Sequence, residues 1–188
     1  MKTGLFFGSF NPIHLGHTTI ARFFQENTPV DEVWLIPSPH NPLKKKEDLL
    51  PYQDRLQMCL IACNSLPGIR VCDIESRMSI PSFTIRTLRT LGSQFPEREF
   101  ILLLGSDSLD SFDQWKDYRE ILDNWEIYIY PRVKDYSIDF RFRKYRITLF
   151  HPPLVNISSS QIRQLMKENK DFSHLVHPEV YTFLTTPK

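Results

Sequence analysis

The sequence is poor in cysteine and glycine, with three and six of these residues among its 188. An odd number of cysteines without metal-ligand clustering fits a reducing compartment better than a disulfide framework. Cys59 and Cys63 lie four residues apart on a predicted helix, which favours core packing over zinc binding. We therefore expect no structural metal site and no disulfide framework.

Long apolar runs and a strong excess of charge are also missing. The longest apolar run, 100–104, is far shorter than the roughly 20 residues that a membrane helix needs. Gly8 and Ser9 interrupt the apolar N-terminus, so it does not read as a secretory signal. A formal net charge of +1 argues against a general nucleic-acid binder. We expect a cytoplasmic protein without membrane or nucleic-acid partners, and the pattern leaves the oligomeric state open.

Apolar runs alternate along the chain with helix-length amphipathic segments, which predicts repeated βαβ units and a mostly parallel sheet with helices on both faces. No repeat, low-complexity tract or linker divides the chain, so we expect one α/β domain over 1–188. The strands are predicted near 2–7, 33–37, 69–74, 100–105, 125–130 and 146–150. The helices are predicted near 15–26, 52–65, 82–93 and 117–123, with a small C-terminal helical part near 158–169 and 178–185.

The turn after the first predicted strand, residues 8–17, reads Gly-Ser-Phe-Asn-Pro-Ile-His-Leu-Gly-His. His14 and His17 lie where a helix begins, and free backbone N–H groups together with the helix dipole favour an anion there. Such a turn suits a polyphosphate. The sequence contains neither a Walker loop nor the dinucleotide Gly-x-Gly-x-x-Gly fingerprint, so neither a P-loop enzyme nor a dehydrogenase is indicated.

This turn resembles the Gly-x-Phe-x-Pro-x-His-x-Gly-His signature of the nucleotidyltransferase superfamily, in which Asp is common where this chain has Asn11. The resemblance implies a Rossmann-like fold and transfer of a nucleotidyl group with loss of pyrophosphate. A second segment, Ile157-Ser158-Ser159-Ser160-Gln161-Ile162-Arg163, resembles the Ile-Ser-Ser-x-x-Ile-Arg element of the same superfamily, which holds the β- and γ-phosphates of ATP. Taken alone, its serines would be good helix N-caps.

Two further segments resemble bacterial nicotinate-nucleotide adenylyltransferases. Residues 105–115 match their Gly-x-Asp-x-Leu…Phe-x-x-Trp pattern, and 82–88 match Ser-Tyr-Thr-x-x-Thr-Leu with Phe83 in place of Tyr. The resemblance implies that Trp115 stacks on the pyridine ring. It also implies that backbone N–H groups at Thr84 and Lys116 hold the nicotinate carboxylate.

The remaining candidates match the family more loosely. Pro37–Lys44 resembles a proline-rich substrate loop, so we expect Lys44 to meet a phosphate, whereas His40 suits either a phosphate contact or an exposed turn. Arg132 matches an arginine that reaches phosphate, although its Tyr-Pro-Arg-Val context departs from Arg-Pro-Gly. The basic residues between Arg141 and Arg146 alternate with Phe142 and Tyr145, which predicts the polar face of a hairpin.

The resemblance implies that AMP is transferred from ATP to nicotinate mononucleotide in one in-line step, without a covalent intermediate. His14, His17 and Arg163 are the expected catalytic residues, and Asp107 is expected to position the ribose or the substrate. Mg²⁺ is expected as a cofactor held mainly by ATP phosphates, with few protein ligands. The ATP-binding residues are expected to be Gly8, Ser9, Phe10, His14, His17, Gly105, Asp107, Ile157, Ser158, Ser159 and Arg163.

Other readings stay open at the level of sequence. Phosphopantetheine adenylyltransferase and the cytidylyltransferases share the first motif but lack the patterns at 82–88 and 105–115. A class I aminoacyl-tRNA synthetase uses a similar turn but needs a longer chain. A regulatory nucleotide-binding module without turnover is the alternative from a different functional class, and the retained histidines, serines and Arg163 argue against it.

Overall fold

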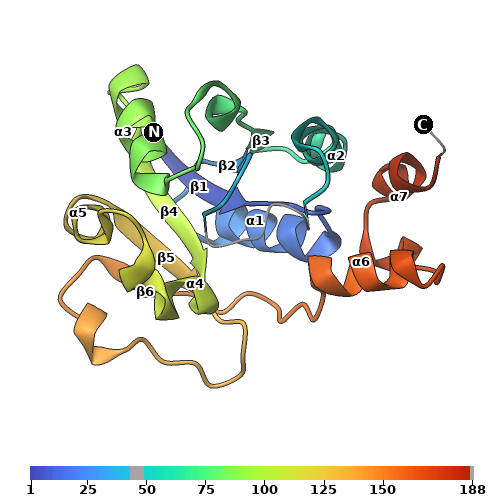
Figure 1. Cartoon of the computed structure of the whole chain (residues 1–188). Helices are drawn as coiled ribbons and strands as arrows, with labels where there is room; N and C mark the ends of the chain where they lie inside the picture. The colour runs from blue at the N-terminus through green and yellow to red at the C-terminus, as the bar shows by residue number, and fades with distance from the viewer. Residues whose placement is uncertain (43–48, 187–188) are drawn as a thin grey trace.

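The computed structural model describes residues 1–42 and 49–186 and forms a six-stranded, fully parallel sheet (Figure 1). The strand order is β3-β2-β1-β4-β5-β6, which confirms the predicted Rossmann-like α/β fold. The strands are β1 Lys2–Gly8, β2 Glu32–Pro37, β3 Ile69–Val71, β4 Glu99–Gly105, β5 Glu126–Tyr130 and β6 Ile147–Leu149.

Helices cover both faces of the sheet, and each face has its own core. The helices α1, α2, α6 and α7 pack on one face, and α3 and α5 pack on the other. Within the described part of the chain, no helix is long and apolar enough to cross a membrane. The helices are α1 Leu15–Asn27, α2 Tyr52–Cys63, α3 Thr84–Gln94, α4 Ser106–Asp110, α5 Tyr118–Asn124, α6 Ser159–Lys167 and α7 Pro178–Thr185.

The strands supply both cores because side chains alternate between the faces of a sheet. In β4, Ile101 and Leu103 belong to the core under α1, whereas Leu102 and Leu104 belong to the core under α3. All four are at most 3% exposed. A strand buried on both sides reads as a continuous apolar run, and this run was the signal that predicted it.

The short elements differ most from the prediction. Strand β3 is shorter than the expected 69–74, and the 3₁₀ helix Ile74–Arg77 follows it. The chain after β4 turns at once into α4 and the 3₁₀ helix Phe112–Gln114, neither of which was predicted. These elements are shorter than two helical turns, so they leave little periodicity in the sequence.

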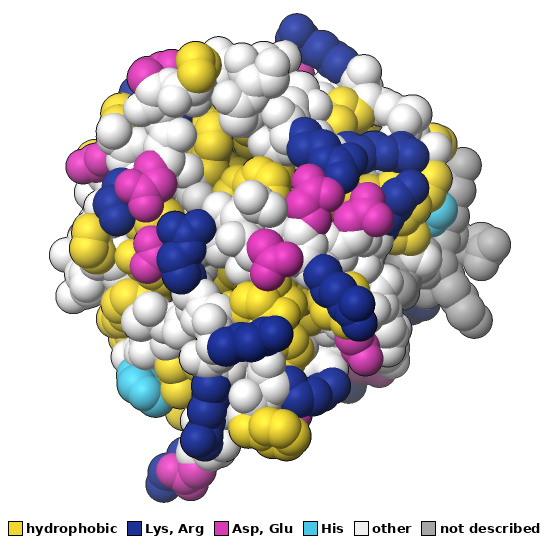
Figure 2. Space-filling view, turned by 90° about the vertical axis from the view of Figure 1, so that its left-hand side faces the viewer, with side chains coloured by type: hydrophobic (Ala, Val, Ile, Leu, Met, Phe, Trp, Pro, Cys, Tyr) yellow, Lys and Arg dark blue, Asp and Glu magenta, His cyan; other side chains and the backbone are white. Residues whose placement is uncertain are grey.

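The hairpin predicted around 141–146 is wrong. Residues Phe140–Phe142 form a 3₁₀ helix, and β5 and β6 are parallel neighbours, which a hairpin cannot join. Phe142 and Tyr145 pack on the α3 side of the core, so an apolar spacing of three residues, typical of a 3₁₀ turn, decides the local structure. On the face of the molecule that carries α5, Lys and Arg side chains lie among Asp and Glu side chains (Figure 2).

The strand order changes direction between β1 and β4. Strands β2 and β3 lie on one side of β1, and β4, β5 and β6 lie on its other side. The chain leaves β1 toward β2 on one side and later adds β4 on the other, so a crevice opens above the carboxyl ends of these two strands. Gly8 ends β1 and Gly105 ends β4. The predicted motifs that follow these glycines therefore meet at the end of the sheet where the carboxyl ends of the strands lie.

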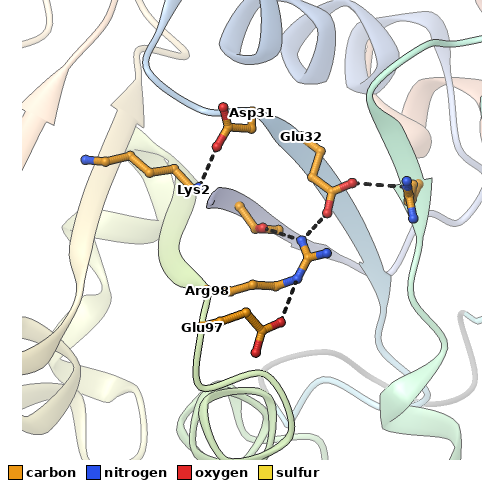
Figure 3. Close-up of polar contacts among 7 residues, drawn as sticks. Lys2, Asp31, Glu32, Glu97 and Arg98 are labelled. Carbon is orange, nitrogen blue, oxygen red and sulfur yellow. Dashed lines mark hydrogen bonds and ion pairs between the residues drawn. The ribbon is translucent and has the colours of Figure 1, made fainter.

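The opposite end of the sheet, where the amino ends of the strands lie, holds a cluster of ion pairs (Figure 3). Glu32 is 3% exposed and bonds to Arg98 and, at 3.0 Å, to Arg70 Nε. Arg98 also donates to Thr3 Oγ1 at 3.0 Å and lies over the ring of Trp34. This cluster ties β1, β2 and β4 together at the end of the sheet away from the crevice.

Candidate active site

A cleft of about 660 Å³ lies at the carboxyl ends of β1 and β4. It brings together both predicted phosphate motifs and the segments at 82–88 and 105–115. Ile157 and His40 are not among its described lining residues, and Lys44 lies outside the described residues. The predicted residues that line the cleft are Gly8, Ser9, Phe10, His14, His17, Thr84, Gly105, Asp107, Trp115, Lys116, Arg132, Ser158, Ser159 and Arg163.

The first turn brings its two histidines together at the start of α1. His14 is the N-cap residue, and its backbone N–H donates to His17 Nδ1 at 3.2 Å. The two imidazole rings stack with centroids 3.6 Å apart. A side chain at N3 that accepts from the N-cap backbone completes half of a capping box, so His17 stabilises the helix start as well as lining the cleft.

Gly8 is required by the turn itself, not only by a ligand. A Cβ at this position would lie 2.8 Å from the ring of Phe10, whose φ of 44° is in the left-handed region. The ring of Phe10 packs edge-on against His17, with centroids 5.0 Å apart. Gly8 therefore allows Phe10 to fold under the turn and support His17.

Burial holds His14 neutral near pH 7. Its side chain is 5% exposed, and Nδ1 has no hydrogen-bond partner among the described residues. Burial, and to a smaller extent the positive charge of Arg132, lowers the pKa of His14 to about 4. A neutral imidazole carries one N–H donor, so His14 can donate to an anion without bringing a permanent charge into the cleft.

The second motif docks directly on the first. Ser158 caps α6 by accepting from the backbone N–H of Gln161 at 3.1 Å, as its sequence predicted. Ser159 Oγ donates to the carbonyl of Pro12 at 2.9 Å, and Arg163 Nη1 donates to the carbonyl of Asn11 at 2.9 Å. Two segments about 150 residues apart in the chain therefore form one wall of the cleft.

Gly105 marks the point where β4 enters the cleft. A Cβ there would lie 2.4 Å from Asp107 Oδ1 and 3.0 Å from Arg132 Nε. Arg132 Nε pairs with Asp107 Oδ1 at 3.2 Å, and its Nη2 donates to Tyr130 Oη at 3.1 Å. Asp107 and Arg132, which the sequence placed in different roles, thus form an ion pair that Gly105 leaves room for.

The wall opposite the phosphate motifs carries the aromatic residues. The half-buried Trp115 packs against Phe112, with ring centroids 4.9 Å apart. Phe83, the N-cap residue of α3, has the Nζ of Lys116 at 4.9 Å from its ring centroid. Phe83, which stands where the family pattern has Tyr, therefore holds the ammonium group of Lys116 beside Thr84.

Two buried charged residues near the cleft escaped the sequence analysis. Arg55 is 1% exposed and Glu75 is 2% exposed. Arg55 falls in register with Met58, Cys59 and Ala62 on the apolar face of α2, so a charge at an apolar position was an available signal. Glu75 accepts from Thr87 Oγ1 at 2.8 Å, and burial raises its pKa. The short 3₁₀ helix that carries Glu75 offered no comparable pattern.

The described residues do not include a cluster of three or more His, Cys, Asp or Glu side chains that could hold a metal ion. Among the described residues that line the cleft, Asp107 is the one carboxylate, and Arg132 already pairs with it. The described residues of the cleft therefore offer few protein ligands to a divalent cation.

Comparisons with known proteins show the family of this chain. The family model described as Cytidylyltransferase-like matches residues 5–165. A protein of Flavobacterium psychrophilum named probable nicotinate-nucleotide adenylyltransferase is 42% identical over 185 residues, covering 98% of this chain and 96% of the relative. A relative of the same name from Cytophaga hutchinsonii is 42% identical over 188 residues, covering 100% and 97%.

Solved structures share the fold. The Plasmodium falciparum nicotinic acid mononucleotide adenylyltransferase complexed with NaAD superposes with a TM-score of 0.83 at 22% identity, covering 97% of this chain and 94% of that one. A putative nicotinate-nucleotide adenylyltransferase from Vibrio parahaemolyticus gives a TM-score of 0.73 at 22% identity, covering 98% and 99%.

Proposed function

Because the chain belongs to the Cytidylyltransferase-like family and, within it, to the nicotinate-nucleotide adenylyltransferases, we propose that its cleft at the ends of β1 and β4 is the adenylyl-transfer site. The enzyme transfers the AMP unit of ATP to nicotinate mononucleotide, giving deamido-NAD and pyrophosphate. The observation that carries the assignment of the site is the meeting of the histidine turn, the start of α6 and Trp115 around one cavity of about 660 Å³.

The reaction needs orientation and charge stabilisation more than a protein nucleophile. The attacking phosphate of nicotinate mononucleotide is already anionic, so the difficulty is to hold two anions in line and to stabilise charge on the phosphoryl oxygens. His17 accepts at Nδ1 from the His14 backbone, so its proton lies on Nε2 when the ring is neutral. We assign Nε2 of His17 to donate to the α-phosphate, with His14 beside it.

The start of α6 is assigned to the leaving pyrophosphate. Ser158 and Ser159 lie at its N-terminus, where the helix dipole favours an anion. Arg163 lies one turn further and is tied to the carbonyl of Asn11 at 2.9 Å, which orients its guanidinium toward the first turn. We therefore assign these residues to the β- and γ-phosphates and the histidines to the α-phosphate.

The wall with Trp115 is assigned to the acceptor. Trp115 is half-buried and lines the cleft, so part of its ring is accessible for stacking on a pyridine ring, and Thr84 and Lys116 line the same cleft. Arg132 and Lys44 are proposed to meet the mononucleotide phosphate. Ile157, which directly precedes Ser158, is proposed to border the ATP site. Mg²⁺ coordinated by ATP phosphates would supply further charge neutralisation. The cytoplasmic location of the protein stays a prediction.

The test is pyrophosphate release. The protein is incubated with ATP, Mg²⁺ and, in turn, nicotinate mononucleotide, nicotinamide mononucleotide and phosphopantetheine, and with CTP in place of ATP. We expect release with ATP and nicotinate mononucleotide. Faster release with phosphopantetheine or with CTP would reassign the substrate, and ATP binding without any release would indicate a regulatory module.

Stereochemistry tests the single displacement. Direct in-line attack inverts the α-phosphorus, whereas a phosphohistidine intermediate requires two displacements and gives net retention. With a chiral α-phosphorothioate analogue of ATP we expect inversion. Retention would reject direct transfer and would make one histidine a nucleophile.

A further inference from the structure

Arg55 occupies an unusual position for a charged residue. It lies in the first turn of α2 and is 1% exposed. Its Nη1 donates to the carbonyls of Ser9 at 2.6 Å and Ser38 at 2.8 Å, and its Nη2 donates to that of Pro39 at 2.9 Å. Its Nε donates to the carbonyl of Leu50 at 3.0 Å. One guanidinium therefore contacts four main-chain oxygens from three segments of the chain.

These segments border the proposed active site. Ser9 belongs to the histidine turn after β1, and Ser38 follows β2 at the neighbouring strand end. Both residues line the cleft. Leu50, just before α2, also donates its N–H to Asn11 Oδ1 at 3.0 Å. Arg55 thus lies where the turn on the ATP side and the segment on the mononucleotide side converge.

Arg55 has no carboxylate partner among the described residues, 1–42 and 49–186. Arg98, in contrast, pairs with Glu32. Burying a guanidinium is costly, and hydrogen bonds to carbonyls offset only part of that cost. An apolar side chain would fill the same space on α2 without this cost, but it would leave the four carbonyls without their donor, so what distinguishes Arg55 is that its N–H groups join three segments of the chain.

We propose that Arg55 is a positioning residue, which holds the histidine turn and the segment after β2 at the separation that ATP and nicotinate mononucleotide require. Its planar fork fixes several carbonyls at once, and its positive charge favours the arrival of two anions above it. The proposal rests on the proposed function. It adds a residue that touches neither substrate and acts through the main chain of Ser9 and Ser38.

The experiment compares Arg55→Met, Arg55→Lys and Arg98→Met as a matched control at the opposite end of the sheet (Figure 3). Dissociation constants for ATP and for nicotinate mononucleotide are measured by calorimetry, and kcat, KM and thermal stability are measured separately. We expect Arg55→Met to weaken the binding of both substrates by about tenfold or more, because the main chain of Ser9 and Ser38, which lines the cleft, is then no longer held in place.

Arg55→Lys keeps the charge but offers only three donors without the fork, so we expect an intermediate loss of affinity. Arg98→Met removes an ion pair far from the cleft and should lower stability while leaving both dissociation constants within about twofold. If Arg55→Met lowers stability as Arg98→Met does but binds both substrates like the wild type, the proposal is wrong.

Chemical rescue gives a second, independent readout. In Arg55→Ala, methylguanidine should restore substrate affinity in a concentration-dependent way, whereas methylammonium should not. If Arg55→Met does not fold, the affinities of Arg55→Lys and the rescue of Arg55→Ala test the positioning role instead. Wild-type affinity of Arg55→Lys for both substrates would overturn that role. A wild type that binds both substrates but releases no pyrophosphate would instead contradict the proposed function, so the two failures are distinguishable.

Discussion

The backbone N–H of His14 donates to Nδ1 of His17 at 3.2 Å, and this single bond joins the start of a helix to the proposed chemistry. An acceptor at Nδ1 fixes the neutral tautomer with its proton on Nε2. The bond also satisfies one of the N–H groups that a helix start leaves without an intrahelical partner. His17 is thereby both a capping residue and an oriented hydrogen-bond donor.

His17→Ala should lower kcat by about 10²-fold or more while ATP binding weakens much less, because the donor acts on charge that develops during transfer. Loss of the cap should also cost about 1 kcal/mol of unfolding free energy. His17→Gln is the control, since glutamine at N3 can still accept from the N-cap backbone. It should recover stability without recovering kcat. Steady-state kinetics with a large rise in ATP KM and unchanged kcat would make His17 a ground-state binding residue.

His14 should make the protein sensitive to acid. Its pKa of about 4 lies below the usual 6.5, so the unfolded chain takes up a proton in this range before the folded chain does. The unfolding free energy should therefore fall by about 3 kcal/mol as the pH drops from above 6.5 to about 4. Urea unfolding at several pH values measures the slope. His14→Asn keeps an N-cap residue and should show a smaller fall, and equal slopes would contradict the assignment.

Glu75 should give the opposite pH dependence. Burial raises its pKa above the usual 4.5, so the unfolded chain loses this proton first as the pH rises. Stability that Glu75 contributes in its protonated form is present below pH 4.5 and declines as the pH rises through the folded-state pKa. Glu75→Gln should keep the bond from Thr87 and flatten this part of the thermal-stability profile. A loss of stability that is the same at every pH would indicate that the burial of an ionisable group is not the cause.

The acid substrate should be strongly preferred. Backbone N–H groups near Thr84 and Lys116 are proposed to hold the nicotinate carboxylate, and they would face an unmatched NH₂ group in nicotinamide. An unpaired buried polar group costs about 1–3 kcal/mol, and lost charge assistance adds to it, so kcat/KM should favour nicotinate mononucleotide by about 10²-fold or more. Comparable kcat/KM values for the two mononucleotides would indicate a dual-specificity enzyme.

Trp115 should not set this preference. Stacking serves both pyridine rings, so Trp115→Ala should weaken both substrates and keep the ratio of their kcat/KM values within about tenfold of the wild type. The two substrates are compared in the same assay for both proteins. A ratio that collapses in Trp115→Ala would mean that stacking and carboxylate recognition are not separable.

Periodicity in the sequence determined the strands and the long helices. A strand such as β4 is buried on both faces and reads as a continuous apolar run, while α3 places Ile85, Leu88 and Leu91 on one face. The turn at 8–17 and the start of α6 were recognisable because tight backbone geometry and helix capping restrict which residue types fit. The basic segment at 141–146 was misjudged, since Phe142 and Tyr145 are three positions apart, which fits a 3₁₀ turn and not the period of two of a strand.

Only the tertiary structure decided which charges are buried and what they contact. Arg55 donates to Ser9, 46 positions earlier in the chain, and Arg163 reaches Asn11 across 152 positions. The pKa of His14 depends on burial and on Arg132, which arrives from the end of β5. Local patterns determine local elements because propensity and periodicity act over a few residues, whereas burial, charge and hydrogen bonding depend on segments that meet only when the sheet has formed.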